Sequence, residues 1–369
     1  MQHRVVLTID LKQLGENYQA VCGIVAPCDV MPVLKANAYG LGVAPIAQAL
    51  VAAGASRIAV AEPFEALQLL NLNVPVQILS GILPDEIDEM VAHGIVLPVV
   101  SFESAQQLSA AACAQQTTAK VHIKLDTGMG RAGIHWTEAE TVLAQMATLP
   151  GLEFEGIFTH FPLAYEQGSD FTDIQVKRFC TILATAESLG YHFKYIHAAN
   201  SDAINNALIT CQAPFNLVRC GINLHGAFDA AGSLRVPLKP VLQMTTRLAQ
   251  VRTRPAGTPI GYGHTFKTQA PMRVGTVCAG YADGLPLALS NRGTVIIRGV
   301  EVPIIGRISM DYLTVCLDTV PEATTGDCVT LLGHDGDAEI QVDTWAKLKG
   351  THAYDIICSI GSRVERRCV

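Results

Sequence analysis

An alternation of two sequence patterns fills the first two thirds of the chain and most constrains its fold. Short β-branched runs that end in polar or glycine residues are each followed by an amphipathic stretch rich in Ala, Leu, Glu and Gln. The strand-like runs are VMPVLKA, RIAVAEP, VQILSG, IVLPVVS, KVHIKLD, FEGIFTH, YIHAANS and NLVRCGI. This repeated strand-then-helix unit predicts an α/β fold, a closed (β/α)8 barrel of the TIM type, although the helix after the last strand is weakly marked.

An open, doubly wound sheet would show the same alternation over any few units. The number of units favours a closed barrel over that alternative. No GxGxxG motif opens a helix after the first strand, which further weakens a dinucleotide-binding interpretation.

The pattern changes after Leu238. Short strand-like runs, such as RVGTVCAGYADG and GTVIIRGVEVPIIGRISMD, are separated by Gly, Pro and Asp turns, and helical periodicity returns only in VDTWAKLKG. We therefore predict a barrel over residues 1–236 and a mostly β C-terminal domain over 237–369. The junction is expected near GSLRVPLKP, residues 232–240, where glycine and proline interrupt both patterns.

Composition excludes several classes of partner. The 369-residue chain is 49% hydrophobic and carries a formal net charge of -7, so it lacks the basic surface of a nucleic-acid-binding protein. No apolar run is long enough to span a membrane, and the N-terminus does not resemble a signal peptide. The eleven cysteines are odd in number, scattered and free of CxxC motifs, which favours a reducing cytoplasm and predicts no metal site. A small-molecule ligand is expected.

Barrels carry their reactive groups at the carboxyl ends of their strands. The candidates there are Lys35, Glu62, Ser80, Gly81, Ser101, Lys124, Asp126, His160, Asn200, Ser201, Arg219 and Gly221. Lys35, in VLKANAYGLG, is the most demanding, because a buried ammonium must be paired, neutralised or covalently engaged. His160, Arg219 and Lys124 each fit a structural role when taken singly. Their occurrence on matching strand ends favours a site.

Nine motifs together resemble one known family. They are VLKANAYGLG, HIKLDTGMGRAGI, GIFTHF, HAANS, LVRCGI, PIGYGHTF, AGYADG, GRISMD and YDIICSI. In this order, and over nearly the whole chain, they are similar to the landmarks of alanine racemases. The resemblance implies a fold-type-III pyridoxal 5'-phosphate barrel followed by a β domain, in a homodimer whose active sites use residues of both subunits.

The resemblance also implies a two-base mechanism that interconverts L-alanine and D-alanine and supplies D-alanine for peptidoglycan. Lys35 would bind the cofactor aldehyde covalently and act as one base, and Tyr262, donated by the partner subunit, would act as the other. Removal of a proton from one face and its return to the opposite face require two opposed bases. His160 would lie beside Tyr262, and Arg219 would be hydrogen-bonded to His160.

Further residues take roles by the same resemblance. Tyr39, Ser201, Tyr354, the backbone amides of Gly221 and Ile222, and neighbouring Asn200 would hold the cofactor phosphate, while Arg131, Met310 and Tyr281 would contact substrate. Lys124 matches a position that is carbamylated in some members. One departure is visible, because GINLHGAF has His225 where the family pattern leads us to expect tyrosine.

Arg219 bears on the type of reaction. An arginine cannot give a proton to the pyridine nitrogen, so the ring would stay neutral and delocalise a carbanion weakly, which favours racemisation over side reactions. A serine or broader amino-acid racemase stays open, since a small pocket discriminates one hydroxyl weakly. A related decarboxylase is disfavoured, because neither its glycine-rich phosphate loop nor its acid near the pyridine nitrogen is found. A non-catalytic cofactor-binding barrel would lack the second domain.

Overall fold

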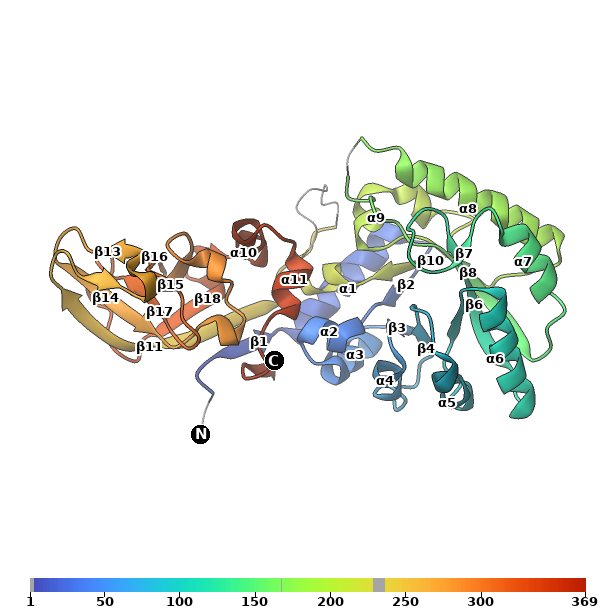
Figure 1. The fold of residues 1–369 in the computed structure, drawn as a ribbon, viewed down its shortest axis with the longest axis horizontal. Helices are drawn as coiled ribbons and strands as arrows, with labels where there is room; N and C mark the ends of the chain where they lie inside the picture. The colour runs from blue at the N-terminus through green and yellow to red at the C-terminus, as the bar shows by residue number, and fades with distance from the viewer. Residues whose placement is uncertain (1–2, 167, 228–235) are drawn as a thin grey trace.

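The computed structural model describes residues 3–166, 168–227 and 236–369, and divides into two parts (Figure 1). A barrel surrounded by helices, coloured blue to yellow-green, forms one end of an elongated molecule. A β domain, coloured orange to red, forms the other end. The fold predicted from the sequence, a (β/α)8 barrel followed by a mostly β domain, is confirmed.

In the described part of the chain, eight parallel strands close the barrel. They are β2 (Asp29–Pro32), β3 (Ile58–Val60), β4 (Val76–Ile78), β5 (Leu97–Val99), β6 (Ala119–Asp126), β8 (Leu152–Phe158), β9 (Tyr195–His197) and β10 (Leu217–Cys220). Ladders join β5, β6, β8, β9, β10 and β2 in that order, and a separate ladder joins β3 to β4. Single bridges, Val33 to Ala59 and Gln77 to Val96, complete the ring.

Helices cover the outside of the barrel. They are α1 (Leu11–Val25), α3 (Val43–Ala52), α4 (Pro63–Leu67), α5 (Ile87–Ala92), α6 (Phe102–Ala114), α7 (Ala139–Met146), α8 (Phe171–Ser188) and α9 (Ser201–Asn206). The segment labelled α2 (Lys35–Gly40) is a left-handed turn at the carboxyl end of the barrel. After β10 the described chain forms only a 3-10 turn, η3 (Ile222–His225), and α1 packs against it. This explains why the sequence marks the last helix weakly.

The β domain is built on a long sheet in the order β19-β18-β15-β16-β17-β14-β11-β1-β20. Its strands are β1 (Val6–Ile9), β11 (Leu242–Arg254), β14 (Met272–Val277), β15 (Thr294–Ile297), β16 (Val300–Ile305), β17 (Leu313–Cys316), β18 (Cys328–Asp335), β19 (Ala338–Ile340) and β20 (Glu365–Cys368). A small hairpin, β12 (Pro259–Ile260) with β13 (Phe266–Lys267), lies beside it. The predicted helix forms α10 (Val342–Lys349), followed by α11 (Ala353–Cys358).

The first strand belongs to the β domain and not to the barrel. Val6–Ile9 pairs with β11 and with β20, so the chain starts in one domain before it builds the other. The predicted junction at residues 232–240 overlaps residues 228–235, which lie outside the described residues. Beyond them, β11 begins at Leu242.

Candidate active site

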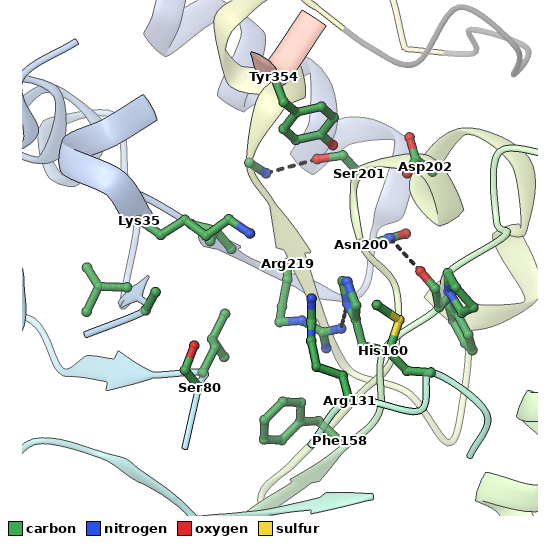
Figure 2. Close-up of a pocket in the computed structure, with 18 of the residues that line it drawn as sticks. Lys35, Ser80, Arg131, Phe158, His160, Asn200, Ser201, Asp202, Arg219 and Tyr354 are labelled. Atoms are coloured by element: carbon green, nitrogen blue, oxygen red, sulfur yellow. Dashed lines mark hydrogen bonds between the residues drawn. The ribbon is translucent and has the colours of Figure 1, made fainter. Parts of the chain in front are cut away.

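A cavity of about 640 Å³ opens at the carboxyl ends of the barrel strands, where α11 of the β domain approaches them. Most of the site residues predicted from the sequence line this cavity. Those lining it are Lys35, Tyr39, Ser80, Lys124, Arg131, His160, Asn200, Ser201, Arg219, Gly221 and Tyr354. Figure 2 shows Lys35 pointing into this cavity toward the side from which Arg219, His160 and Arg131 enter it.

Lys35 lies in an unusual turn, not on the strand that the sequence predicted for it. Strand β2 ends at Pro32, and the four residues 36–39 that follow Lys35 all have left-handed backbone angles, with φ between 53° and 59°. A left-handed residue other than glycine costs about 1–2 kcal/mol. Hydrogen bonds hold the turn, since Asn37 N–H donates to the Glu65 carboxylate (3.1 Å) and Val43 N–H to the Asn37 side chain (2.8 Å). Strain kept in this way is typical of a functional site.

Arg219 is the most heavily held side chain of the cavity. Its Nη1 donates to Nδ1 of His197 (2.9 Å), and its Nη2 donates to the carbonyl oxygens of Thr159 (2.8 Å) and Ala198 (2.9 Å). Nη2 also contacts Nδ1 of His160 at 3.3 Å, which confirms the predicted link between Arg219 and His160. Nη2 carries only two protons, so the longer contact with His160 shares a proton with one of the two carbonyl bonds. Since a guanidinium only donates, Nδ1 of His160 is unprotonated and a neutral His160 carries its proton on Nε2.

The cavity has an excess of positive charge. Lys35, Lys124, Arg131 and Arg219 all line it, and among the described residues none of the four forms an ion pair with a carboxylate. Burial, with the charge of Arg131, lowers the pKa of Lys35 and lowers that of Lys124 to about 8. Burial also lowers the pKa of Arg219 to about 9. Such a site suits a ligand with more than one anionic group.

A tight corner beside Gly221 fits a bound phosphate. Gly221 N–H donates to Ser201 Oγ (3.0 Å), and a Cβ at position 221 would overlap the hydroxyl of Tyr39. Tyr354, from α11, packs near Tyr39 with ring centroids 6.0 Å apart. Asn200 caps α9, because its side chain accepts from Ala203 N–H (3.0 Å). Hydroxyl and amide donors around a backbone without a side chain are the groups that a phosphate oxygen can approach.

Arg131 is positioned through its backbone. The carboxylate of Asp126 accepts the N–H groups of residues 128–131 at 2.9–3.2 Å, and so folds the loop that carries Arg131 to the cavity. Lys124 donates to the Leu79 carbonyl at 2.9 Å. Asp126 thus shapes a turn and does not line the cavity. Three other strand-end candidates also lie outside the lining. They are Gly81, Glu62, which is the N-cap residue of α4, and Ser101, which caps α6 by accepting from Ser104 N–H.

Three predicted site residues lie outside the cavity, on the surface of the β domain. Tyr262, Met310 and Tyr281 are 72%, 52% and 43% exposed, and none of them lines the cavity. Their loops are adjacent, because a bridge pairs Gly261 with Arg307 and Tyr281 N–H donates to the Ser309 carbonyl (3.0 Å). The structure of one chain therefore does not bring Tyr262 to Lys35. Ile222 is buried behind Gly221, beside the cavity.

Several residues around the site were missed by the sequence reasoning. Phe158 lines the cavity and stacks on His197 with centroids 4.8 Å apart and planes 7° apart. His352 lies edge-on to Tyr354. His225, the visible departure, is buried and edge-on to Tyr39 at 5.2 Å. A histidine inside an otherwise apolar strand was the available signal for His197.

Comparison with known proteins now gives the context of this site. Two family models match the chain, one described as the alanine racemase N-terminal domain over residues 9–229 and one as the C-terminal domain over 241–368. An alanine racemase of Syntrophobacter fumaroxidans is 39% identical over 358 residues, which cover 96% of this chain and 94% of the relative.

Solved structures agree. Alanine racemase from Streptomyces lavendulae has a TM-score of 0.92 at 33% identity, covering 100% of this chain and 98% of the other. A structure of alanine racemase from Bartonella henselae, with covalently bound pyridoxal phosphate, has a TM-score of 0.90 at 31% identity and full coverage of both chains. Fold and site thus define a barrel enzyme of the isomerase class. The chain belongs to the alanine racemase family.

Among the described residues, no group of three or more His, Cys, Asp or Glu side chains is arranged to hold a metal ion. No helix in the described ranges is long and apolar enough to cross a membrane.

Proposed function

We propose that this chain interconverts L-alanine and D-alanine with pyridoxal 5'-phosphate, in a cavity that a second copy of the chain completes. The observation that carries the proposal is the division of the site. Lys35, His160 and Arg219 meet at one cavity, whereas Tyr262 stands exposed on the β domain. A base that must face Lys35 across the substrate then has to come from another subunit.

The residues of the cavity fit the cofactor. When bound, pyridoxal phosphate makes the α-proton of an amino acid acidic by withdrawing electrons from the α-carbon. Lys35 would hold its aldehyde covalently, which removes the difficulty of a buried ammonium. Tyr39, Ser201, Tyr354, and the backbone N–H groups of Gly221 and Ile222 would hold its phosphate, with Asn200 beside them.

Arg219 would face the pyridine nitrogen as a hydrogen-bond donor. Its Nη atoms are engaged with His197, His160 and two carbonyls, and its Nε makes no hydrogen bond among the described residues. Nε–H is therefore the donor left to reach a group in the cavity. Because arginine does not release that proton at neutral pH, it limits electron withdrawal and favours return of the α-proton.

Two bases would move the α-proton. The lowered pKa of Lys35, caused first by burial, favours the neutral amine, which is the form that would accept the α-proton. We assign to Lys35 the α-proton of the D-isomer and to Tyr262 of the partner subunit that of the L-isomer. His160, whose Nε2–H is free to donate, would stabilise the phenolate of this tyrosine.

Substrate binding would rest on Arg131 and on the partner's surface loops. Arg131 would pair with the substrate carboxylate, and Met310 and Tyr281 of the partner subunit would narrow the entrance, so that small side chains are preferred. Arg363 braces these loops, donating to Asp283 (2.7 Å), Asp311 (2.6 Å) and the Met310 carbonyl (3.2 Å). A serine racemase differs from this proposal only in preference between two small substrates.

Lys124 would be carbamylated. Its pKa of about 8 leaves a fraction of neutral amine, the form that reacts with carbon dioxide, and the product anion would orient Arg131. Electron density for a carboxylate beyond Nζ in a crystal structure supports this modification, and a bare ammonium there rejects it.

In the cell, the chain would act as a cytoplasmic homodimer. Its role would be to supply D-alanine for peptidoglycan. A racemase assay over a panel of L-amino acids tests the catalytic proposal. We expect turnover of L-alanine to exceed that of serine and of larger amino acids. Cofactor colour that borohydride abolishes, without turnover of any amino acid, would instead identify a binding protein.

A further inference from the structure

A line of hydrogen bonds runs from the cavity through the barrel interior to its opposite end. It begins at Arg219 on β10 and passes to His197 on β9 (2.9 Å). From Nε2 of His197 it continues to Nδ1 of His122 on β6 (2.9 Å), and from Nε2 of His122 to the carboxylate of Glu155 on β8 (3.2 Å). Arg57, just before β3, closes the line at the same oxygen of Glu155 (3.0 Å).

The two ends fix the direction of every bond in this line. Arg219 can only donate, so Nδ1 of His197 must accept, and the proton of a neutral His197 then lies on Nε2. That proton is donated to Nδ1 of His122, whose own proton must then lie on Nε2 and be donated to Glu155. A carboxylate only accepts, so no other arrangement of protons satisfies the line.

The barrel is shaped to hold this line. Both imidazoles are fully buried, and a Cβ at Gly156 would lie 2.5 Å from the ring of His122, so glycine at this strand position makes the space for it. The rings are supported by stacking, His197 on Phe158 and His122 on Tyr195. Arg57 lies over Tyr195 at 3.8 Å and is 1% exposed. From Arg219 to Glu155 each donor along the line has an acceptor, as a polar line at this depth requires, whereas Nε and Nη1 of Arg57 have no hydrogen-bond partner among the described residues.

We propose that Glu155 is a positioning residue for the reaction: it fixes the Nε2–H tautomers of His122 and His197 and thereby holds Arg219 in place against the cofactor. The inference rests on the proposed function, in which Arg219 faces the cofactor. It extends the machinery to the far end of the barrel, to a residue that does not line the cavity.

The charges support this assignment. Arg219 touches four acceptors, all of them neutral groups, and no carboxylate in the described part of the chain contacts it directly. Glu155 is the anion at the end of its hydrogen-bond line, and each imidazole that donates toward an anion becomes a better acceptor at its other nitrogen. Burial lowers the pKa of His122 to about 4 and that of His197 well below its usual value, so both rings stay neutral, as the line requires.

The direct test is the protonation state of the two rings. The holoenzyme, labelled with nitrogen-15 in histidine, would be studied by NMR, with His122→Asn and His197→Asn used for assignment. We expect both rings to be neutral with the proton on Nε2. A proton on Nδ1 of either ring, or a doubly protonated ring, overturns the proposal, whatever the racemase assay shows.

A pair of double variants separates the acceptor from the ion pair. R57L/E155L removes both charges, so that no unpaired charge is buried, and leaves Nε2–H of His122 without an acceptor. R57L/E155Q restores a neutral acceptor. We expect kcat to fall about 10-fold in the first, with KM nearly unchanged, and to recover in the second.

The outcomes are distinct. Unchanged tautomers and unchanged kcat in R57L/E155L overturn the proposal, and so does a loss that R57L/E155Q does not reverse. If R57L/E155L does not fold, R57M/E155M, whose side chains are closer in length to the originals, replaces it, and the tautomers of the wild-type rings can still overturn the proposal. A wild-type chain with the predicted tautomers but no racemase activity would count against the proposed function and not against the hydrogen-bond line.

Discussion

The barrel cavity and the exposed loops of the β domain each carry half of one predicted site. The residues of the first half are enclosed, and those of the second are exposed to solvent. Lys35, His160 and Arg219 are enclosed, hydrogen-bonded or shifted in pKa by burial. Tyr262 and Met310 are mostly exposed on loops that the β-domain sheet supports. In the proposed function the cavity supplies one base, Lys35, and the loops supply the other, Tyr262, which does not line the cavity of its own chain. In a pair of chains, the loops of one copy would complete the cavity of the other.

The largest expected effect lies in the enclosed half. Lys35→Ala removes the covalent anchor and one of the two bases, so racemase activity should fall by about 10⁴-fold or more. The measurement is the rate of D-alanine formation, together with the visible absorbance of bound cofactor after borohydride treatment. The matched control is Lys12→Ala, because Lys12 lies on the outside of α1 with its side chain 88% exposed. An undiminished rate in Lys35→Ala would end the proposed mechanism.

The exposed half should give nearly as large a loss without any loss of stability. Tyr262→Phe removes the hydroxyl that acts as the second base, so activity should fall by about 10²- to 10⁴-fold. Its unfolding free energy should change by less than about 0.5 kcal/mol, because the residue is exposed in the single chain.

The control for Tyr262→Phe is a buried tyrosine outside the site. Tyr191 donates to the Leu143 carbonyl at 2.8 Å, so Tyr191→Phe should lower stability by about 1 kcal/mol and leave racemase activity unchanged. If Tyr262→Phe and Tyr191→Phe changed racemase activity and stability in the same way, a catalytic role specific to Tyr262 would be contradicted.

A smaller effect is expected at the phosphate corner. Gly221→Ala places a Cβ against the Tyr39 hydroxyl, and overpacking of this kind costs about 1–3 kcal/mol. Cofactor affinity, measured by titration of the cofactor-free chain, should therefore fall about 10-fold. Gly23→Ala in α1, where a Cβ meets nothing within 4 Å, is the control and should bind cofactor normally. Equal affinities would place the phosphate elsewhere.

The last effect concerns stability against acid, not catalysis, and distinguishes the barrel interior from the surface. His122 has a pKa of about 4 in the folded chain and near 6.5 when unfolded, so between these values the unfolded chain binds more protons. Stability should therefore fall as pH drops from about 6.5 to 4, by on the order of 3 kcal/mol from this residue. Thermal unfolding across this range measures it.

The same experiment has two informative variants. His122→Phe should flatten the pH dependence, since a phenyl ring binds no proton. His93→Gln replaces an exposed histidine at the end of α5 and should leave the slope as it is. A slope unaffected by His122→Phe would assign the acid sensitivity to other groups.

Much of the fold could be predicted because its signals are local. Alternating strands and helices appear directly in the residue pattern, and the carboxyl ends of parallel strands necessarily meet. This brought Lys35, Lys124, His160 and Arg219 to one cavity in the prediction and in the structure. The placement of β1 was not predictable in this way, because its partners, β11 and β20, lie hundreds of residues away along the chain.

Other features depend on packing that a residue pattern does not carry. The turn at residues 36–39 has left-handed backbone angles, which alanine and tyrosine disfavour. Local propensity therefore predicts a different conformation there. His122 and Glu155 looked like ordinary members of strands, and only the closed barrel shows that they face one another. Tyr262 was nominated by resemblance to a family, and one chain alone leaves it without a substrate to act on.

The most direct test of the central claim is complementation between two inactive variants, Lys35→Ala and Tyr262→Phe, coexpressed in one cell. If each site takes its lysine from one subunit and its tyrosine from the other, every mixed dimer regains one intact site, and activity should reach roughly a quarter of the wild-type value. If the two residues act within one chain, no intact site can form. Activity no greater than that of the two variants measured separately would contradict a site shared between subunits.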